Sequence, residues 1–314
     1  MNNYILGSGL VGLLARHILG PSYKIIPFYR SRFYTFNPAL DDNFLVRDKR
    51  TDKFIEEING GKLGPVYMYK KMWSVGGALS SGYDKELCYR WLAKIFGYNV
   101  PNESMIYQQN QMDVFVYDLR LNKLYQTLME MYSEEIKAAL AHGTVTAIKD
   151  HRIAFNTSIT LPYDKIISTI PLNALCKYIN KSIDLKARTL HYLHITTEEL
   201  DFEGANQVLV TDGSFDFYKV TNVAPNRYMI YCHNEMPDPG LYLMQFMRNF
   251  DIIDGTSVTE ALPIGQPPDV TDIESLGIQC VGGNAQWDWC MDISSCIIKL
   301  LRIANNTQHM QVLV

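Results

Sequence analysis

Residues 7–12, which read GSGLVG, constrain the fold of this chain more than any other segment. They follow a short apolar stretch that begins at Tyr4 and precede a helical apolar pattern that ends near Gly20. A second apolar stretch covers residues 23–28, so the order is strand, glycine turn, helix, strand. This order predicts the opening unit of a dinucleotide-binding domain.

Each glycine of this turn has an expected physical role. Gly7 permits the tight turn, Gly9 lets the backbone approach a pyrophosphate, and Gly12 lets the helix pack closely on the strand. The helix N-terminus offers N–H groups and the positive end of its dipole to a phosphate. The alternative is a glycine-rich turn in an unrelated α/β fold. The cofactor-binding residues expected here are Gly7, Ser8, Gly9, Leu10, Val11 and Gly12.

The end of the second predicted strand departs from the dinucleotide-binding pattern. An acidic residue usually stands there to hold the ribose hydroxyls, but this chain has Arg30 and Arg32. In a nicotinamide enzyme these arginines indicate a 2′-phosphate and therefore NADP. In a flavoprotein they indicate altered ribose binding, and as ordinary surface charges they carry no function.

Two later segments decide between these alternatives. Residues 163–172, YDKIISTIPL, resemble the strand and Ser/Thr-x-Pro turn of the amine oxidase, protoporphyrinogen oxidase and UDP-galactopyranose mutase group of flavoproteins. Residues 143–148 resemble the segment whose valine backbone clamps adenine in that group. The resemblance implies FAD as the cofactor, with Val145, Thr169 and Pro171 in its site.

Residues 277–293 resemble the C-terminal flavin segment of the mutase branch: a strand, a glycine turn, aromatic residues, Met-Asp and a helix. A helix N-terminus there could stabilise negative charge on the flavin ring. Asn284 stands where arginine is usual, and the alternative is a strand–helix pair without a ligand. The resemblance implies cofactor contacts from Gly282, Gly283, Asn284, Trp287, Met291, Asp292 and Ile293.

The fold class expected is α/β, with a Rossmann-type FAD-binding domain, an inserted β-rich substrate domain and a small helical insertion. The FAD-binding domain is predicted from residues 1–64, 143–175 and 265–314. The helical insertion spans 65–142 and the β-rich lid 176–264. Residues 30–64 are expected to be irregular. Helices are predicted at 84–97, 119–141 and 291–304, a hairpin at 144–155 with its turn at Lys149-Asp150, and strands at 208–210, 215–220, 228–233 and 278–282.

The β-rich region is expected to supply the substrate side. Phe215, Phe217 and Lys219 are predicted on one face of a strand, and Met229, Tyr231 and His233 on one face of another. The predicted catalytic residues are Lys219, Tyr231 and His233. A solvent-facing lysine is the alternative interpretation of Lys219.

The resemblance implies oxidation of a C–N bond in an amine or amino-acid group, by hydride transfer to flavin N5 with O₂ as acceptor. Three alternatives stay open. One is a compact phage-type enzyme that acts on an amino acid attached to thymine in DNA. Another is mutase-like chemistry without net redox, and the third is a flavin-binding protein without catalysis.

The composition limits the partners. A net charge of −4 and a pI of about 6.0 argue against tight nonspecific binding of nucleic acid. Six cysteines without a CxxC pair, no leader and no long apolar run predict a cytoplasmic protein with free thiols and no membrane span. His191 and His194 are expected to face opposite sides of a strand, so no metal is predicted. The expected partner is a small amine, amino-acid or nucleoside-linked substrate, and the oligomeric state is left open.

Overall fold

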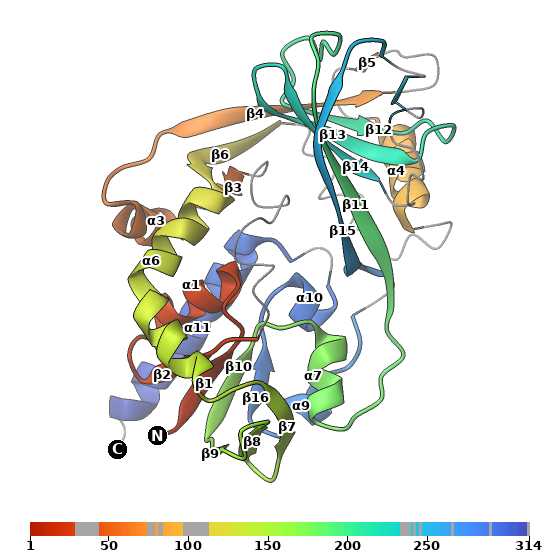
Figure 1. Ribbon diagram of the computed structural model, residues 1–314. Helices are drawn as coiled ribbons and strands as arrows, with labels where there is room; N and C mark the ends of the chain where they lie inside the picture. The colour runs from red at the N-terminus through yellow and green to blue at the C-terminus, as the bar shows by residue number, and fades with distance from the viewer. Residues whose placement is uncertain are drawn as a thin grey trace.

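The computed structural model describes residues 1–28, 44–73, 79–80, 84–96, 113–232, 240, 243–244, 247–264, 267–288 and 291–312. Within these residues the strands form three sheets, and helices lie on both faces of the four-stranded parallel one (Figure 1). The α/β class predicted from the sequence is therefore confirmed. Arg30, Arg32 and His233 lie outside the described residues.

The first sheet is four-stranded and entirely parallel, in the order β16-β10-β1-β2. Its strands are β1 (Asn3–Leu6), β2 (Tyr23–Ile26), β10 (Lys165–Ser168) and β16 (Ile278–Cys280). Segments from the beginning, middle and end of the sequence thus lie side by side. The register pairs Leu6 with Ser168 and Ser168 with Cys280, so these three strands end at the same level.

Both faces of this sheet are buried, as expected of a parallel sheet. Alternate strand residues enter two hydrophobic clusters: Ile5 and Ile167 belong to one, Leu6 and Ile166 to the other. The first cluster is completed by α1 (Leu10–Leu19), α3 (Asp52–Asn59), α6 (Leu121–Leu140) and α11 (Ile293–Val312). The second cluster is completed by α7 (Leu172–Tyr178), α9 (Thr271–Glu274), α10 (Gly283–Gln286) and a small antiparallel sheet of β7 (Val145–Lys149), β8 (Arg152–Phe155) and β9 (Thr160–Pro162).

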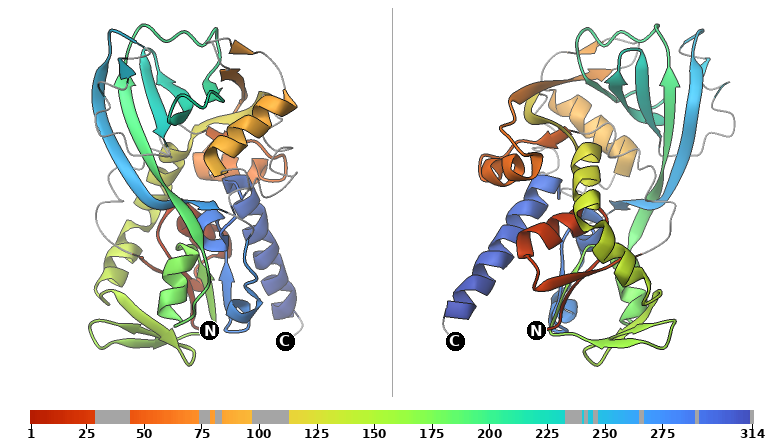
Figure 2. Two further views of the ribbon diagram at one scale, coloured as in Figure 1. Left: turned by 90° about the vertical axis from the view of Figure 1, so that its right-hand side faces the viewer. Right: turned by 60° about the vertical axis from the view of Figure 1, so that its left-hand side comes forward.

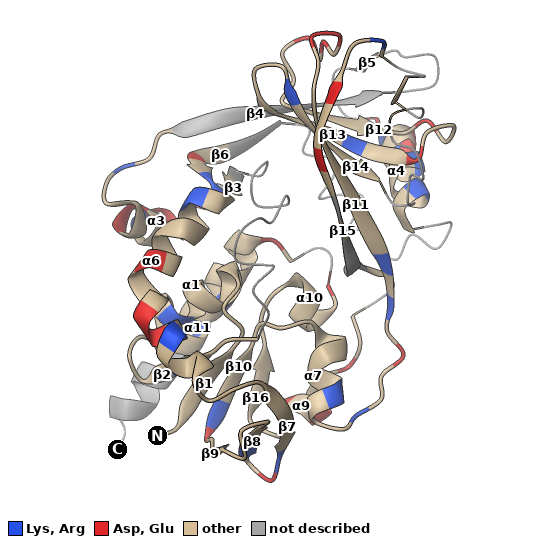
Figure 3. Cartoon of the chain, in the orientation of Figure 1, with Lys and Arg blue, Asp and Glu red and all other residues tan. Residues whose placement is uncertain are grey.

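Charged side chains from the helices pair with both edges of the parallel sheet. At the β2 edge, Glu135 of α6 accepts a hydrogen bond of 3.0 Å from the Ile25 N–H and forms an ion pair of 2.9 Å with Arg16. At the β16 edge, Lys299 of α11 donates to the Cys280 carbonyl at 3.0 Å. Edge groups that are occupied in this way cannot recruit another strand. The rest of α6 carries residues of both charges, as Figure 3 shows.

The second sheet is nine-stranded and mixed, since β4 and β12 pair in parallel and the other pairs are antiparallel. Figure 2 shows two of its strands, β11 and β15, curving from this sheet down towards the first. The strands are β3 (Phe44–Val46), β4 (Pro65–Trp73), β5 (Leu79–Ser80), β6 (Asp113–Arg120), β11 (Lys186–Thr196), β12 (Gln207–Val210), β13 (Phe217–Ala224), β14 (Arg227–Cys232) and β15 (Asp251–Ile264).

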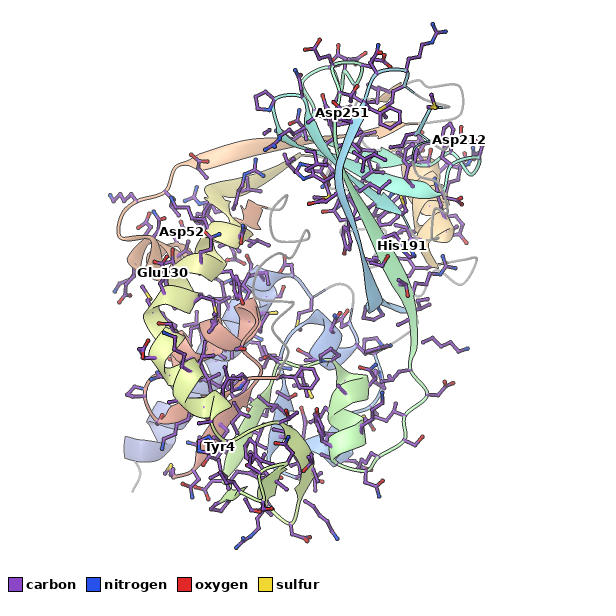
Figure 4. All side chains as sticks on the ribbon, in the orientation of Figure 1. Tyr4, Asp52, Glu130, His191, Asp212 and Asp251 are labelled. Carbon is purple, nitrogen blue, oxygen red and sulfur yellow. The ribbon has the colours of Figure 1, made fainter. Side chains whose placement is uncertain are left out.

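Helix α4 (Lys85–Phe96) packs on one face of the second sheet, and Lys94 anchors it there. Its ammonium donates to the carbonyls of Val210, Asp212 and Phe217 at 3.3, 2.6 and 2.7 Å. Figure 4 labels Asp212 at this end of the sheet. Each of the three N–H groups of the Lys94 ammonium therefore has a carbonyl acceptor in or between β12 and β13. Burial lowers the pKa of Lys94 to about 8.

Lys94→Met is expected to lower the free energy of unfolding at pH 7 by about 1–3 kcal/mol, because three buried carbonyls lose their donor. Burial places the folded pKa of Lys94 below the ordinary lysine value of 10.5, so the unfolded chain binds this proton more tightly. The titration therefore stabilises the wild type above the unfolded pKa, and that contribution is lost as the pH falls through about 8. Denaturant unfolding at about pH 7 and pH 9.5 should show the gap between wild type and variant widening with pH. Lys85→Met, at an exposed position of the same helix, is the control. An equal difference in unfolding free energy between wild type and Lys94→Met at both pH values would contradict the lowered pKa of Lys94.

Most predicted elements are confirmed, three expectations are wrong, and one strand was missed. Residues 65–142 are not only helical: β4 and β6 join the second sheet, as their alternating apolar residues permit, while α6 packs on α1 and β2. Residues 30–64 contain α3, whose stop signal is Gly60 in the left-handed conformation. The turn of the β7–β8 hairpin uses Asp150 and His151, both at positive φ. Strand β15 was not predicted, because Asp, Gly, Ser and Pro interrupt its apolar pattern.

Across the described residues, every helix is too short or too polar to span a lipid bilayer.

Candidate functional site

Three turns meet at one edge of the parallel sheet. They follow β1, β10 and β16, whose last residues, Leu6, Ser168 and Cys280, are aligned. The Thr169 N–H and Oγ1 both donate to the Leu6 carbonyl, at 2.9 and 3.1 Å, and the Val281 N–H donates to the Ser168 carbonyl at 2.9 Å. Ligands of open α/β sheets bind outside these carboxyl ends. The structure therefore brings together the three motifs that the sequence predicted to form one site.

Gly7 and Gly12 are required by packing within this edge. Gly7 has φ +117°, and a Cβ added to it would overlap Thr169 Oγ1. A Cβ on Gly12 would overlap the Gly7 carbonyl oxygen and lie 3.0 Å from Thr169 Oγ1. The tight turn at Gly7 and the close helix packing at Gly12 are confirmed. Thr169 fills the space that both glycines leave.

Gly9 differs from its two neighbours. A Cβ added there meets no atom of the described part of the chain within 4 Å. Gly9 is also the N-cap of α1, and within the described residues no side chain caps this end and no acid lies in its first turn. The first N–H groups of α1 and the positive end of its dipole therefore favour an anion at this end of the helix.

The third turn lies against the first. Gly282 has φ +121°, and a Cβ added to it would lie 3.7 Å from the Val11 side chain of α1. Gly283 and Asn284 follow in α10, and the Asn284 side chain is exposed. Thr169 and Pro171 are half-buried, whereas Ser8 and Leu10 are buried. All three turns therefore lie at one edge of the parallel sheet, and Asn284 is an exposed polar side chain of α10 at that edge.

Two predicted cofactor contacts have structural roles. The Trp287 side chain is only 2% exposed, so its ring cannot stack on a bound cofactor in this arrangement. Asp292 caps α11, because its carboxylate accepts the Ser295 N–H at 2.7 Å. Met291 and Ile293 pack against the cluster that contains α1. The sequence predicted this segment beside the site but did not predict the burial of Trp287. A cofactor contact from Asp292, whose side chain is exposed, stays a prediction.

Val145 lies in a different sheet from the three turns. It opens β7, pairs with Phe155 of β8, and its side chain is buried. A backbone contact from Val145 to adenine stays a prediction.

The thiols near the third turn are poor nucleophiles. Burial raises the pKa of the Cys280 thiol to about 12, and it raises the pKa of the Cys296 thiol to about 12 as well. Both thiols are therefore protonated at neutral pH.

On the second sheet, two of the predicted catalytic residues are direct cross-strand neighbours. Lys219 of β13 pairs with Tyr231 of β14, and the Lys219 ammonium lies 3.6 Å from the centre of the Tyr231 ring. Tyr231 is only 3% exposed and also contacts Tyr192, with ring centres 4.9 Å apart. Lys219 is half-buried and is therefore the more exposed member of the pair. The sequence missed Tyr192, although it lies in an apolar stretch around residues 190–195.

The predicted alternation of Phe217 and Lys219 on one face is wrong. A bulge between these residues shifts the register, so that Phe217 opposes Cys232 while Lys219 opposes Tyr231. Phe217 therefore enters one hydrophobic cluster and Tyr231 the other, on the opposite face of the sheet. Phe215 and Phe217 remain stacked, with ring centres 5.4 Å apart.

His191 and His194 bind different partners on β15. The Nδ1 atom of His191 lies 2.7 Å from Ser257 Oγ, and that of His194 lies 3.9 Å from Asp254. Figure 4 labels His191 on β11, the strand that descends towards the first sheet. Each histidine thus faces its own neighbour on β15.

This combination of a covered parallel sheet and a larger mixed sheet is the fold of the flavoprotein group that the sequence motifs resemble. A reduced UDP-galactopyranose mutase matches 98% of this chain and 94% of its own, with a TM-score of 0.67 and 12% identity. A CLA-producing fatty acid isomerase from P. acnes matches 97% and 98%, with a TM-score of 0.61 and 11% identity. A putrescine oxidase with bound putrescine matches 98% and 99%, with a TM-score of 0.56 and 10% identity.

No family model matches the sequence, and no curated protein matches it. At these identities the structural matches establish the fold alone.

Proposed function

We propose that this protein binds FAD at the edge formed by the three turns and acts as a flavin-dependent oxidoreductase. The main observation that supports this proposal is the assembly of these turns around the N-terminus of α1, with open space at Gly9 in the described structure. The structural matches to a UDP-galactopyranose mutase and a putrescine oxidase, from the flavoprotein group that the motifs resemble, also support FAD as the cofactor.

The chain's own groups fit such a cofactor. The N–H groups at the start of α1 would hold the pyrophosphate, because they have a favourable dipole and no carboxylate among the described residues of the first turn. Gly282 and Gly283 would bring a second stretch of backbone alongside Val11. Asn284 would contribute a neutral contact in place of the arginine that is usual in the mutase branch.

We propose oxidation of a C–N bond in an amine or amino-acid group as the reaction. When bound, FAD supplies a hydride acceptor at N5, and O₂ would regenerate it. The protein would orient the substrate C–H bond and exclude water. Lys219 is the proposed substrate-side residue, and the rings of Tyr231 and Tyr192 beneath it would fix its position. A substrate attached to a thymine base remains a variant of this proposal.

A second candidate is mutase-like chemistry without net redox. It is favoured by one observation, the TM-score of 0.67 to a reduced UDP-galactopyranose mutase over nearly the whole of both chains. The two candidate reactions require different redox states of the flavin: the oxidase starts from oxidised FAD, and the mutase-like reaction from reduced FAD.

The purified protein is expected to be yellow and to release FAD, rather than FMN or NADP, on denaturation. Anaerobic mixing with a panel of amines and amino acids, free and nucleoside-linked, should bleach the visible band, and oxygen should restore it with peroxide formed. The control is the dithionite-reduced protein incubated with UDP-galactopyranose. Isomerisation of the sugar without bleaching by any amine would replace the oxidase proposal with the mutase. A colourless protein that cannot be reconstituted with FAD would overturn both.

A further inference from the structure

Trp287 joins the third turn to the second sheet. Its indole is buried in the same cluster as Ala285 of α10 and Leu172 of α7. The indole N–H donates to the Lys186 carbonyl at 3.0 Å. Because Lys186 is the first residue of β11, one side chain connects the glycine turn with the strand that leads into the second sheet (Figure 1).

The backbone of Trp287 is in an unusual conformation. It has φ 57° and ψ 38°, the left-handed region that bulky L residues rarely adopt. Two hydrogen bonds close the turn around it, from the Gln286 N–H to the Gly282 carbonyl at 2.9 Å and from the Asp288 N–H to the Gly283 carbonyl at 2.8 Å. A residue stays in such a conformation only where its surroundings over-determine it. Here the buried indole and its hydrogen bond supply that constraint.

Further contacts extend this connection in both directions. On one side, Gly282 lies against Val11, in the first turn of the helix whose N-terminus forms the proposed pyrophosphate site. On the other side, α10 packs against β15, the strand that pairs with β11 along most of its length. The path from α1 to the second sheet is therefore continuous and runs through residues 282–288.

We propose that Trp287 is a positioning residue that couples the cofactor site to the second sheet. By pinning the 282–288 turn to the start of β11, it makes the backbone beside Val11 and the strand carrying Tyr192 open and close as one unit. The cofactor part of this inference rests on the proposed FAD site. The mechanical coupling needs no cofactor, because it rests on the buried indole and its hydrogen bond to Lys186.

The chain offers a matched control for this tryptophan. Trp91 of α4 is also buried, at 3% exposure, and its indole N–H donates to a sheet carbonyl, that of Tyr218, at 2.6 Å. It pins α4 to β13 and is not part of the path through residues 282–288. Trp287→Phe and Trp91→Phe therefore remove the same chemical group, one on the path and one away from it.

The test is hydrogen–deuterium exchange of the unliganded protein, followed by titration with FAD. Trp287→Phe is expected to raise the exchange rates of both 278–288 and 186–190 by roughly tenfold, because one buried acceptor loses its donor. Trp91→Phe should raise exchange in α4 and β13 and leave 278–288 unchanged. The FAD dissociation constant should rise roughly tenfold in Trp287→Phe and stay unchanged in Trp91→Phe.

A second measurement needs no variant and covers the case in which Trp287→Phe does not fold. Wild-type exchange in increasing urea should show 278–288 and 186–190 opening with the same free energy and the same urea dependence. Separate openings would overturn the coupling, as would faster exchange confined to 278–288 in Trp287→Phe. If the wild type binds no FAD, the proposed function fails, while both exchange experiments still decide whether Trp287 couples the two segments.

Discussion

Gly9→Val is expected to leave the protein folded and to weaken FAD binding by more than about 100-fold. The added Cβ meets no described atom within 4 Å, so no described backbone or side chain excludes a residue larger than glycine there. The valine side chain would instead occupy the space in front of the α1 N-terminus, where the proposed pyrophosphate approaches. Valine is also a poorer N-cap than glycine, which lowers the free energy of unfolding by only about 1 kcal/mol.

The measurement pairs FAD titration, followed by flavin fluorescence, with denaturant unfolding. The matched control is Gly61→Val, because a Cβ added to Gly61 also meets no described atom within 4 Å and the residue follows α3 rather than β1. This control should bind FAD like the wild type. Stoichiometric FAD in a folded Gly9→Val protein would show that the turn does not serve the phosphate.

The sequence predicted the parts of the site that depend on backbone. Gly7, Gly9 and Gly12 each constrain the chain locally. Their spacing alone therefore indicates that Gly7 forms the tight turn, that Gly9 leaves open space and that Gly12 allows close helix packing. The three turns could be placed together because the carboxyl ends of parallel strands share one edge of the sheet. The predicted strands around residues 4–6, 166–168 and 278–280 duly align.

Side-chain roles within those segments could not be predicted in the same way. Trp287 belongs to a segment that resembles a flavin contact, yet its ring is buried and its N–H pairs with Lys186, over 100 residues earlier in the chain. Phe217 and Lys219 have the spacing of one strand face, but a bulge separates them. Long-range partners and bulges are set by tertiary packing, which a single sequence does not display.

The second sheet was the least predictable part of the fold. Its edge strand β15 alternates poorly, and β4 pairs with β12 across more than 130 residues. Lys94 illustrates the same limit for a single side chain. A lysine at a helical position predicts an exposed charge, but the Lys94 ammonium satisfies three carbonyls from β12, β13 and the segment between them.

Gly12→Ala is expected to lower the free energy of unfolding by roughly 2–4 kcal/mol. Helix propensity alone predicts the opposite sign, since alanine is favoured over glycine inside a helix by about 1 kcal/mol. Packing overrides propensity here, because the new Cβ would overlap the Gly7 carbonyl oxygen and lie 2.8 Å from its carbon. The two nearest atoms belong to the Gly7 backbone, which cannot move away as a flexible side chain could, so α1 must shift from β1.

Gly9→Ala is the matched control, in the same turn and three residues earlier, and its stability should stay within about 1 kcal/mol of the wild type. Urea denaturation followed by circular dichroism gives both values without any ligand. A Gly12→Ala protein as stable as the wild type would mean that α1 does not pack on Gly7 as closely as the structure shows. If Gly12→Ala is destabilised and Gly9→Ala is not, the two glycines have separate roles: Gly12 holds the helix against the strand, and Gly9 keeps the space in front of that helix open.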